Sequence, residues 1–209
     1  MRRVPIVPTA LVALAVAAMI ALGFWQLLDR RPKKAAFLEQ LAANPAKPPV
    51  AFPRITDDRL LFRRVRAMCL QPLSGTMAGA GAAGFRWIVE CRTGAEGPGM
   101  AVQLGTTRDP LTKPVWKGGV VQGYLSHAPD SRPMIAALFD RTPQRMLLVA
   151  DAPPPGLTRN AAPDLSSVPN NHLAYAVQWF LFALVAIVIY VLALRLRART
   201  GTAARNLPR

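Results

Sequence analysis

The residues with the clearest chemical potential lie at the start of an apolar run near the C-terminus. His172, Tyr175 and Trp179 are spaced i, i+3 and i+7, which places them on one face of a helix, and Ala176 leaves a small surface one turn beyond the imidazole. A flat macrocycle fits such a face, and a neutral imidazole is an ordinary axial ligand of haem iron. The same residues are also typical of a membrane interface, where His bonds to headgroups and aromatic rings form a belt. From the residues alone, interface anchoring is the simpler interpretation.

A second group of polar residues lies within the apolar runs themselves. Gln26 ends the first run and Gln178 lies in the last, and amide groups in such a setting need hydrogen-bond partners. Gly23, one turn before Gln26, permits close approach of another helix. Two antiparallel spans would bring this end of the first run to the same membrane face as His172. The two glutamines could then bond to each other or to a ligand, and helix–helix hydrogen bonding is the commoner role.

No enzyme signature accompanies these residues, so we expect a protein that is not an enzyme. The chain has two histidines and lacks a nucleophile motif, a metalloprotease motif, a glycine-rich phosphate loop and paired carboxylates in an apolar setting. His127, at an expected strand end, is interpreted as a surface histidine. Cys69 and Cys91 lack the spacing of a redox or zinc motif. They either form a disulfide in an oxidising compartment or remain buried thiols.

The elements that must position these residues are two apolar runs at the ends of the chain. Residues 9–28 and 172–194 contain no Asp, Glu, Lys or Arg, and each is long enough to cross the ~30 Å hydrocarbon core as a helix. A cleaved signal peptide is the alternative for the first run, because Arg2 and Arg3 precede it and small residues follow. The length of the run and its aromatic–basic border favour an anchor.

The charge distribution predicts the orientation of the chain. Lys and Arg exceed Asp and Glu by 15, and the excess lies largely beside the apolar runs, which suits membrane phosphates better than nucleic acid. Residues 164–173, before the last run, contain no Lys or Arg, whereas the tail after it is basic, so both termini are predicted to be cytoplasmic. The basic cluster at residues 30–34 favours the opposite orientation. The cations of the tail are Arg195, Arg197, Arg199, Arg205 and Arg209.

The expected fold class is membrane α + β, in which two transmembrane helices flank a small, mainly antiparallel-β (α+β) extracytoplasmic domain. Short β-prone runs bounded by glycine or proline predict antiparallel strands within residues 60–69, 85–91, 100–104, 120–125 and 145–150. We expect a short helix over residues 37–42, a glycine-alanine loop at 75–84, a hairpin turn at 94–99 and a helix-compatible segment at 134–139. The predicted order is a cytoplasmic N-terminus (1–8), a span (9–28), an interfacial segment and proline-rich connector (29–54), the β-rich domain (55–152), a proline-rich return segment (153–171), a second span (172–194) and a basic cytoplasmic tail (195–209).

Two motifs resemble those of the Surfeit-locus family of cytochrome oxidase assembly proteins. Residues 168–180 combine Asn-His-Leu-x-Tyr-Ala with an aromatic pair at fixed spacing, and residues 22–26 read Leu-Gly-Phe-Trp-Gln. The resemblance covers mainly the two ends of the chain. In the middle, residues 104–110 lack the family's Arg-Gly-Trp turn, whereas Trp116, Gly118, Gly119 and Gly123 fit its later glycine-bearing strand.

The resemblance implies a role in maturing subunit I of an aa3-type cytochrome c oxidase in the bacterial inner membrane, with haem A as a transient cofactor. By that resemblance His172 becomes the ligand of the haem iron, and Tyr175, Trp179, Trp25 and Gln26 shape a pocket between the spans. The implied partners are cytochrome c oxidase subunit I, haem A synthase and membrane lipid, with no nucleic acid. The alternative is a cofactor-free membrane scaffold that stabilises subunit I during assembly.

Overall fold

The protein is described by a computed structural model that covers residues 5–94, 99–130, 132–133, 139–140 and 142–203. These residues divide into two compact units, one formed by the two ends of the chain and the other by Phe37–Ser167. Several sequence-based predictions fall outside the described residues: those for Arg2 and Arg3, for residues 95–98 of the hairpin turn, for residues 134–138 of the helix-compatible segment, and for Arg205 and Arg209.

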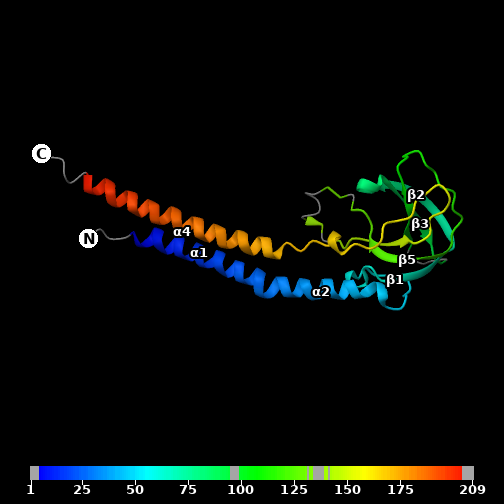
Figure 1. The fold of residues 1–209 in the computed structure, drawn as a ribbon, viewed down its shortest axis with the longest axis horizontal. Helices are drawn as coiled ribbons and strands as arrows, with labels where there is room; N and C mark the ends of the chain where they lie inside the picture. Colours follow the sequence, from blue (N-terminus) through cyan, green and yellow to red (C-terminus); the bar gives the residue numbers. More distant parts are fainter. Residues whose placement is uncertain (1–4, 95–98, 131, 134–138, 141, 204–209) are drawn as a thin grey trace. The chain divides into compact units, whose positions relative to one another are not determined.

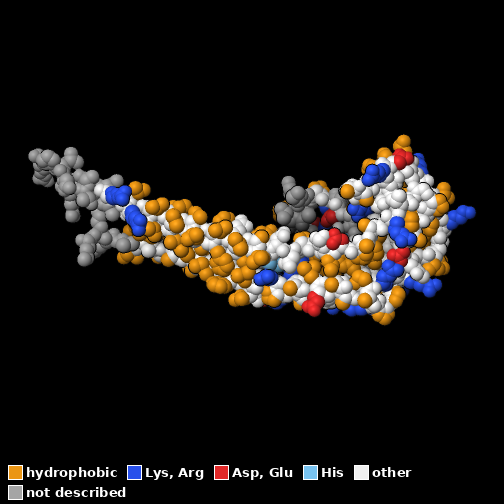
Figure 2. All heavy atoms as spheres, in the orientation of Figure 1, with side chains coloured by type: hydrophobic (Ala, Val, Ile, Leu, Met, Phe, Trp, Pro, Cys, Tyr) orange, Lys and Arg blue, Asp and Glu red, His pale blue; other side chains and the backbone are white. Residues whose placement is uncertain are grey.

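The unit formed by the chain ends consists of long apolar helices. α1 spans Ile6–Trp25, a π-helical turn follows at Gln26–Arg30, α2 begins at Arg31 and ends at Ala43, and α4 spans His172–Ala203 (Figure 1). Two helical stretches are long and apolar enough to cross a membrane, and they contain α1 and α4. Figure 2 shows hydrophobic side chains covering the middle of this helical pair. Surfaces of this kind are typical of helices that contact lipid or other helices.

Small residues allow α1 and α4 to pack closely. Gly23 is buried, and a Cβ atom at this position would lie 2.6 Å from the Phe180 ring, so a larger residue would push the helices apart. Ala176 and Ala183 are the most buried residues of α4, at 0% and 3% exposure. The rings of Phe24 and Phe180 meet edge to face at 5.3 Å between centroids. Near the other end of the pair, the Thr9 and Tyr190 hydroxyls share a hydrogen bond.

The second unit contains a six-stranded sheet in the order β1-β5-β6-β4-β3-β2. Its strands are β1 (Arg64–Cys69), β2 (Gln71–Gly79), β3 (Phe85–Arg92), β4 (Met100–Thr107), β5 (Gly119–His127) and β6 (Met146–Ala150). The five predicted strands are confirmed, as is the antiparallel pairing of β3 with β4 across the expected hairpin. β4 and β6 are buried along their whole length and form the centre of the sheet.

Three sequence-based predictions about this unit need correction. The expected loop at residues 75–84 is wrong in its first half, because β2 continues to Gly79 and pairs with β3. The sheet is mainly antiparallel, as predicted, but antiparallel pairing fails for one pair, because β6 inserts between β5 and β4 and runs parallel to β4. The short helix expected over residues 37–42 belongs to the longer α2, which ends before Asn44 as predicted.

The sheet curls so that its two edge strands meet at one corner. β1 and β2 are opposite edges of the sheet, yet only Leu70 separates them in sequence. The Leu70 N–H donates to the Arg92 carbonyl at 2.9 Å, and the disulfide between Cys69 and Cys91 ties β1 to β3. Both cysteines are almost fully buried. The disulfide alternative is therefore the one that this structure adopts.

The segments that precede and follow the sheet in the sequence are joined to it through backbone hydrogen bonds. In the proline-rich connector, Val50 forms a parallel bridge with Val65 of β1. In the return segment, Thr158 exchanges two backbone hydrogen bonds with Thr106 of β4. Gly105 lies where a Cβ would come within 2.7 Å of the Thr158 carbonyl, so the first half of the region that lacks the family's Arg-Gly-Trp turn, up to Thr107, is a buried strand with a backbone packed on it.

Candidate functional site

The central feature of the helical unit is a hydrogen bond between its two long helices. His172 is the first residue of α4, and its Nδ1 lies 2.8 Å from Oε1 of Gln26, the residue that follows α1. An amide oxygen only accepts hydrogen bonds, so Nδ1 carries the proton and donates it. In a neutral imidazole the other nitrogen, Nε2, then holds a lone pair. The site thus presents a partly buried imidazole whose Nε2 can accept a proton or bind a metal ion.

Local helix geometry places Gln26 at this position. Gln26 begins the π-helical turn, and the Arg31 N–H donates to the Gln26 carbonyl five residues earlier. Single π-helical turns within α-helices are rare and often occur at functional sites. Close packing at Gly23, one turn before, brings α4 near enough for the Gln26 side chain to reach it.

Among the described residues, no hydrogen bond or ring pair joins the other residues predicted for the site, Tyr175, Trp179 and Trp25, to one another. Tyr175 and Trp25 are about half exposed, at 50% and 42%. The guanidinium of Arg30 lies over the Trp25 ring at 4.5 Å, a cation–π contact. Trp179 contacts Phe182 of its own helix edge to face, at 6.2 Å between ring centroids.

The two glutamines of the apolar runs do not bond to each other. Gln26 bonds to His172, whereas Gln178 is exposed on α4. Helix spacing explains why Gln178 does not take part. His172 and Ala176 are four residues apart and share the face of α4 that meets α1, whereas Gln178 lies on a different face. The hydrogen bond that the sequence left open is therefore a His–Gln bond.

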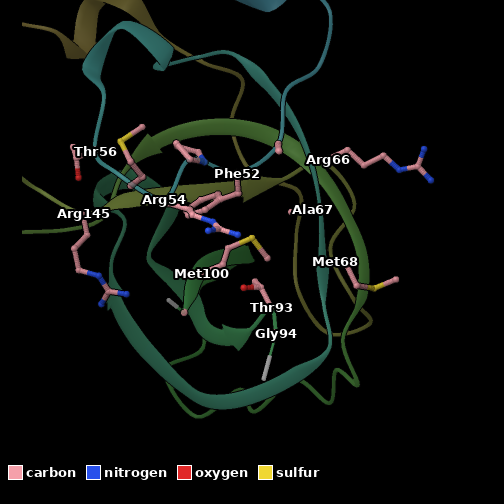
Figure 3. Close-up of a pocket in the computed structure, with 14 residues that line it drawn as sticks. Phe52, Arg54, Thr56, Arg66, Ala67, Met68, Thr93, Gly94, Met100 and Arg145 are labelled. Atoms are coloured by element: carbon pink, nitrogen blue, oxygen red, sulfur yellow. The ribbon is translucent and has the colours of Figure 1, made fainter. Parts of the chain in front are cut away.

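The β domain carries a pocket of about 750 Å³. It opens between the connector, β1 and the start of β4, and the described residues of its lining include Arg54, Arg66 and Arg145 but no Asp or Glu. Figure 3 shows Arg54 extending across the pocket near Met100, whereas Arg66 points outward. Glu90 pairs with Arg145 through two hydrogen bonds of 2.9 and 3.1 Å. The lining offers positive charge but no nucleophile paired with a base.

The remaining candidate residues have structural partners. His127 Nε2 lies 2.9 Å from Asp58 Oδ1, so this histidine joins β5 to the short 3₁₀ turn before β1. The two cysteines are joined in the disulfide. Among the described residues, no three His, Cys, Asp or Glu side chains gather into a metal-binding group. His127 is therefore engaged through Nε2, whereas His172 is engaged through Nδ1.

The motifs in the sequence single out His172 and Gln26 separately, but they do not predict the hydrogen bond between them. That contact depends on the π-helical turn, for which the sequence carries no recognised signal. Gly23 is the one available indication, because a glycine within a span favours close helix packing.

The comparisons with known proteins agree with the geometry of the helical unit. A model of the SURF1 family matches residues 13–184, which include the middle domain as well as both motif regions. No curated protein and no solved structure matches the chain significantly. The matched region covers most of the chain, from within α1 to within α4. The chain therefore belongs to the SURF1 family, whose members are membrane proteins associated with cytochrome c oxidase assembly.

Proposed function

We propose that this protein binds haem A transiently and delivers it to subunit I of an aa3-type cytochrome c oxidase, with His172 as the iron ligand. The observation that carries the proposal is the hydrogen bond from His172 Nδ1 to Gln26, which leaves Nε2 with a lone pair. Histidine ligands of metals characteristically donate their other ring nitrogen to such an acceptor. Family membership supports the oxidase as the destination.

The residues around His172 fit a large apolar ligand with a metal centre. Tyr175 and Trp25 offer half-exposed aromatic surface near the imidazole, whereas Ala176 is fully buried on the face of α4 that meets α1. Close contact between Gly23 and Phe180 fills the seam between the helices, which favours an exposed flank of the pair for the macrocycle. If haem is bound, His172 would hold its iron by donating the Nε2 lone pair, and the aromatic side chains would contact the ring.

We place the β domain on the extracytoplasmic side of the bacterial inner membrane, with both termini in the cytoplasm. The disulfide between Cys69 and Cys91 supports this orientation, because disulfides persist in oxidising compartments such as the periplasm. Three arginines in the described part of the tail, Arg195, Arg197 and Arg199, follow the apolar part of α4 and agree with the positive-inside rule. Added protease should digest the domain in spheroplasts and spare it in inside-out vesicles, and the reverse pattern would contradict the orientation.

The haem proposal is tested by absorption spectra of the detergent-purified protein from cells that synthesise haem A. The chain has only two histidines, so His127→Ala is a matched control for His172→Ala. We expect a haem A band in the wild type and in His127→Ala and none in His172→Ala. A band that persists unchanged in His172→Ala would assign the iron to another ligand.

The alternative function is a cofactor-free scaffold that stabilises oxidase subunit I. The exposed apolar side chains along α4, such as Phe182, Val185 and Ile189, favour it because they offer a surface for another transmembrane helix. A wild-type protein without haem, purified from membranes that contain haem A, would support the scaffold. Normal oxidase maturation with His172→Ala would support it as well.

A further inference from the structure

We propose that Gln26 is a positioning residue, which fixes the tautomer and orientation of His172 without itself contacting the ligand; this inference rests on the proposed function. The amide oxygen of Gln26 is already engaged at 2.8 Å from His172 Nδ1. It serves as the hydrogen-bond acceptor that a metal-binding histidine needs on its second nitrogen. Gln26 thereby acts on the ligand through His172.

The arrangement of the backbone supports a dedicated role for this hydrogen bond. The π-helical turn begins at Gln26 itself and interrupts an otherwise continuous helical stretch from Ile6 to Ala46. Single π-helical turns are rare and often occur at functional sites, where a side-chain contact accounts for them. The His172 hydrogen bond is such a contact, because it satisfies two polar groups in an apolar setting.

Without this hydrogen bond, the His172 imidazole would lose both its fixed orientation and its preference for the tautomer with the proton on Nδ1. A leucine at position 26 accepts no hydrogen bond, so the proton can move to Nε2, the atom that the ligand needs free. Residues that support a metal ligand in this way typically change metal affinity by 10- to 100-fold when they are replaced. Glutamate accepts the same hydrogen bond and makes the imidazole a stronger donor to the metal, so it should preserve ligation and lower the reduction potential of bound iron.

The first test measures the tautomer in the absence of haem. The full-length protein in detergent, labelled with ¹⁵N-histidine and carrying His127→Gln to remove the second histidine signal, is examined at alkaline pH, where the imidazole is neutral. We expect a protonated Nδ1 and an unprotonated Nε2 for His172, retained in Gln26→Glu and lost or mixed in Gln26→Leu. Gln178→Leu, which removes the exposed glutamine of α4, is the matched control and should leave the spectrum unchanged. A protonated Nε2 in the wild type would overturn the inference.

The second test titrates haem A into the same variants. We expect Gln26→Leu to bind about 10- to 100-fold more weakly than the wild type, Gln178→Leu to bind equally, and Gln26→Glu to bind with near wild-type affinity at a more negative midpoint potential. Normal haem affinity in Gln26→Leu would overturn the inference while the proposed function stands. Failure of the wild type to bind haem, together with the expected Nδ1–H tautomer, would instead overturn the proposed function and leave the His172–Gln26 pairing established.

Discussion

Removal of the disulfide should destabilise the β domain by an amount that follows from the length of the loop that the disulfide closes. Cys69 and Cys91 are 22 residues apart, and closing a loop of that length restricts the unfolded chain by about 3 kcal/mol. Both residues are buried, at 1% and 0% exposure, and neither lies near His172 in sequence. Reduction should therefore weaken the folded domain without altering the helical unit directly.

The assay is urea unfolding of the full-length protein in detergent, followed by brief proteolysis that digests only unfolded domain. For a denaturant slope of about 2 kcal/mol per molar, a loss of about 3 kcal/mol lowers the midpoint by roughly 1.5 M. Wild type without reductant is compared with reduced wild type and with a Cys69→Ala, Cys91→Ala double variant. Reductant should not change the urea midpoint of the double variant.

Two results would refute this reasoning. If oxidised and reduced wild type unfold at the same urea concentration, the cross-link does not constrain the unfolded chain. If mass spectrometry of protein isolated under thiol-blocking conditions finds two free thiols, the cysteines are unpaired in the cell and the support for an oxidising compartment is lost.

Three further predictions concern the β domain. Gly123→Ala should lower the unfolding free energy by about 2–3 kcal/mol in the same urea assay, because a Cβ there collides with the Val149 carbonyl across the β5–β6 pair. Asn160→Ala should cost about 2–4 kcal/mol by urea unfolding, since it removes three buried hydrogen bonds to β4 and β6. The pKa of Asp140 is lowered to about 2, chiefly by the hydrogen bond from the Thr142 hydroxyl, so its carboxylate signal in a ¹³C NMR titration should shift near pH 2 and nearer its ordinary value in Thr142→Ala.

Each of these predictions has a matched control or a contradicting result. Gly79→Ala is the control for Gly123, because a Cβ at Gly79 meets no atom within 4 Å, and it should change stability little. If Asn160→Ala leaves the unfolding free energy unchanged, the former partners of Asn160 must form hydrogen bonds with water instead. Because the pKa of Asp140 is lowered in the folded protein, its carboxylate contributes to folding stability above the pKa that it has in the unfolded chain. This contribution is lost as pH falls through about 2. Titration near pH 4 in the folded protein would contradict the assigned contacts.

The sequence predicts the spans and most strands because hydrophobic pattern alone decides them. β3, β4, β5 and β6 are apolar runs with flanking turn residues, and the two spans are long uncharged runs. β2 escapes prediction because Gly75, Ala78 and Gly79 have low β-propensity and the strand pairs only with β3. Backbone hydrogen bonding to a neighbour, which leaves no mark on composition, makes this segment a strand.

The features that the sequence does not predict depend on contacts between residues that are distant in the chain. The spacing of Cys69 and Cys91 leaves their pairing open, and only the curl of the sheet brings the two residues together. The parallel β4–β6 pair depends on where β6 inserts, which no local pattern encodes. At the candidate site, the motif identifies His172, whereas its partner Gln26 depends on the π-helical turn and on close helix packing.

The position of β6 has a consequence for the order in which the domain can fold. β6 is the last strand to be synthesised, yet it lies between β5 and β4 and joins β1-β5 to β4-β3-β2. Until residues 146–150 emerge, the facing edges of these two parts have unpaired backbone groups, which are prone to pair with other chains. The hairpins of β2, β3 and β4 can form early from local contacts, whereas completion of the sheet requires the end of the domain. A chain that stalls or is cut before Met146 would therefore present two open edges and depend on chaperones to remain unaggregated.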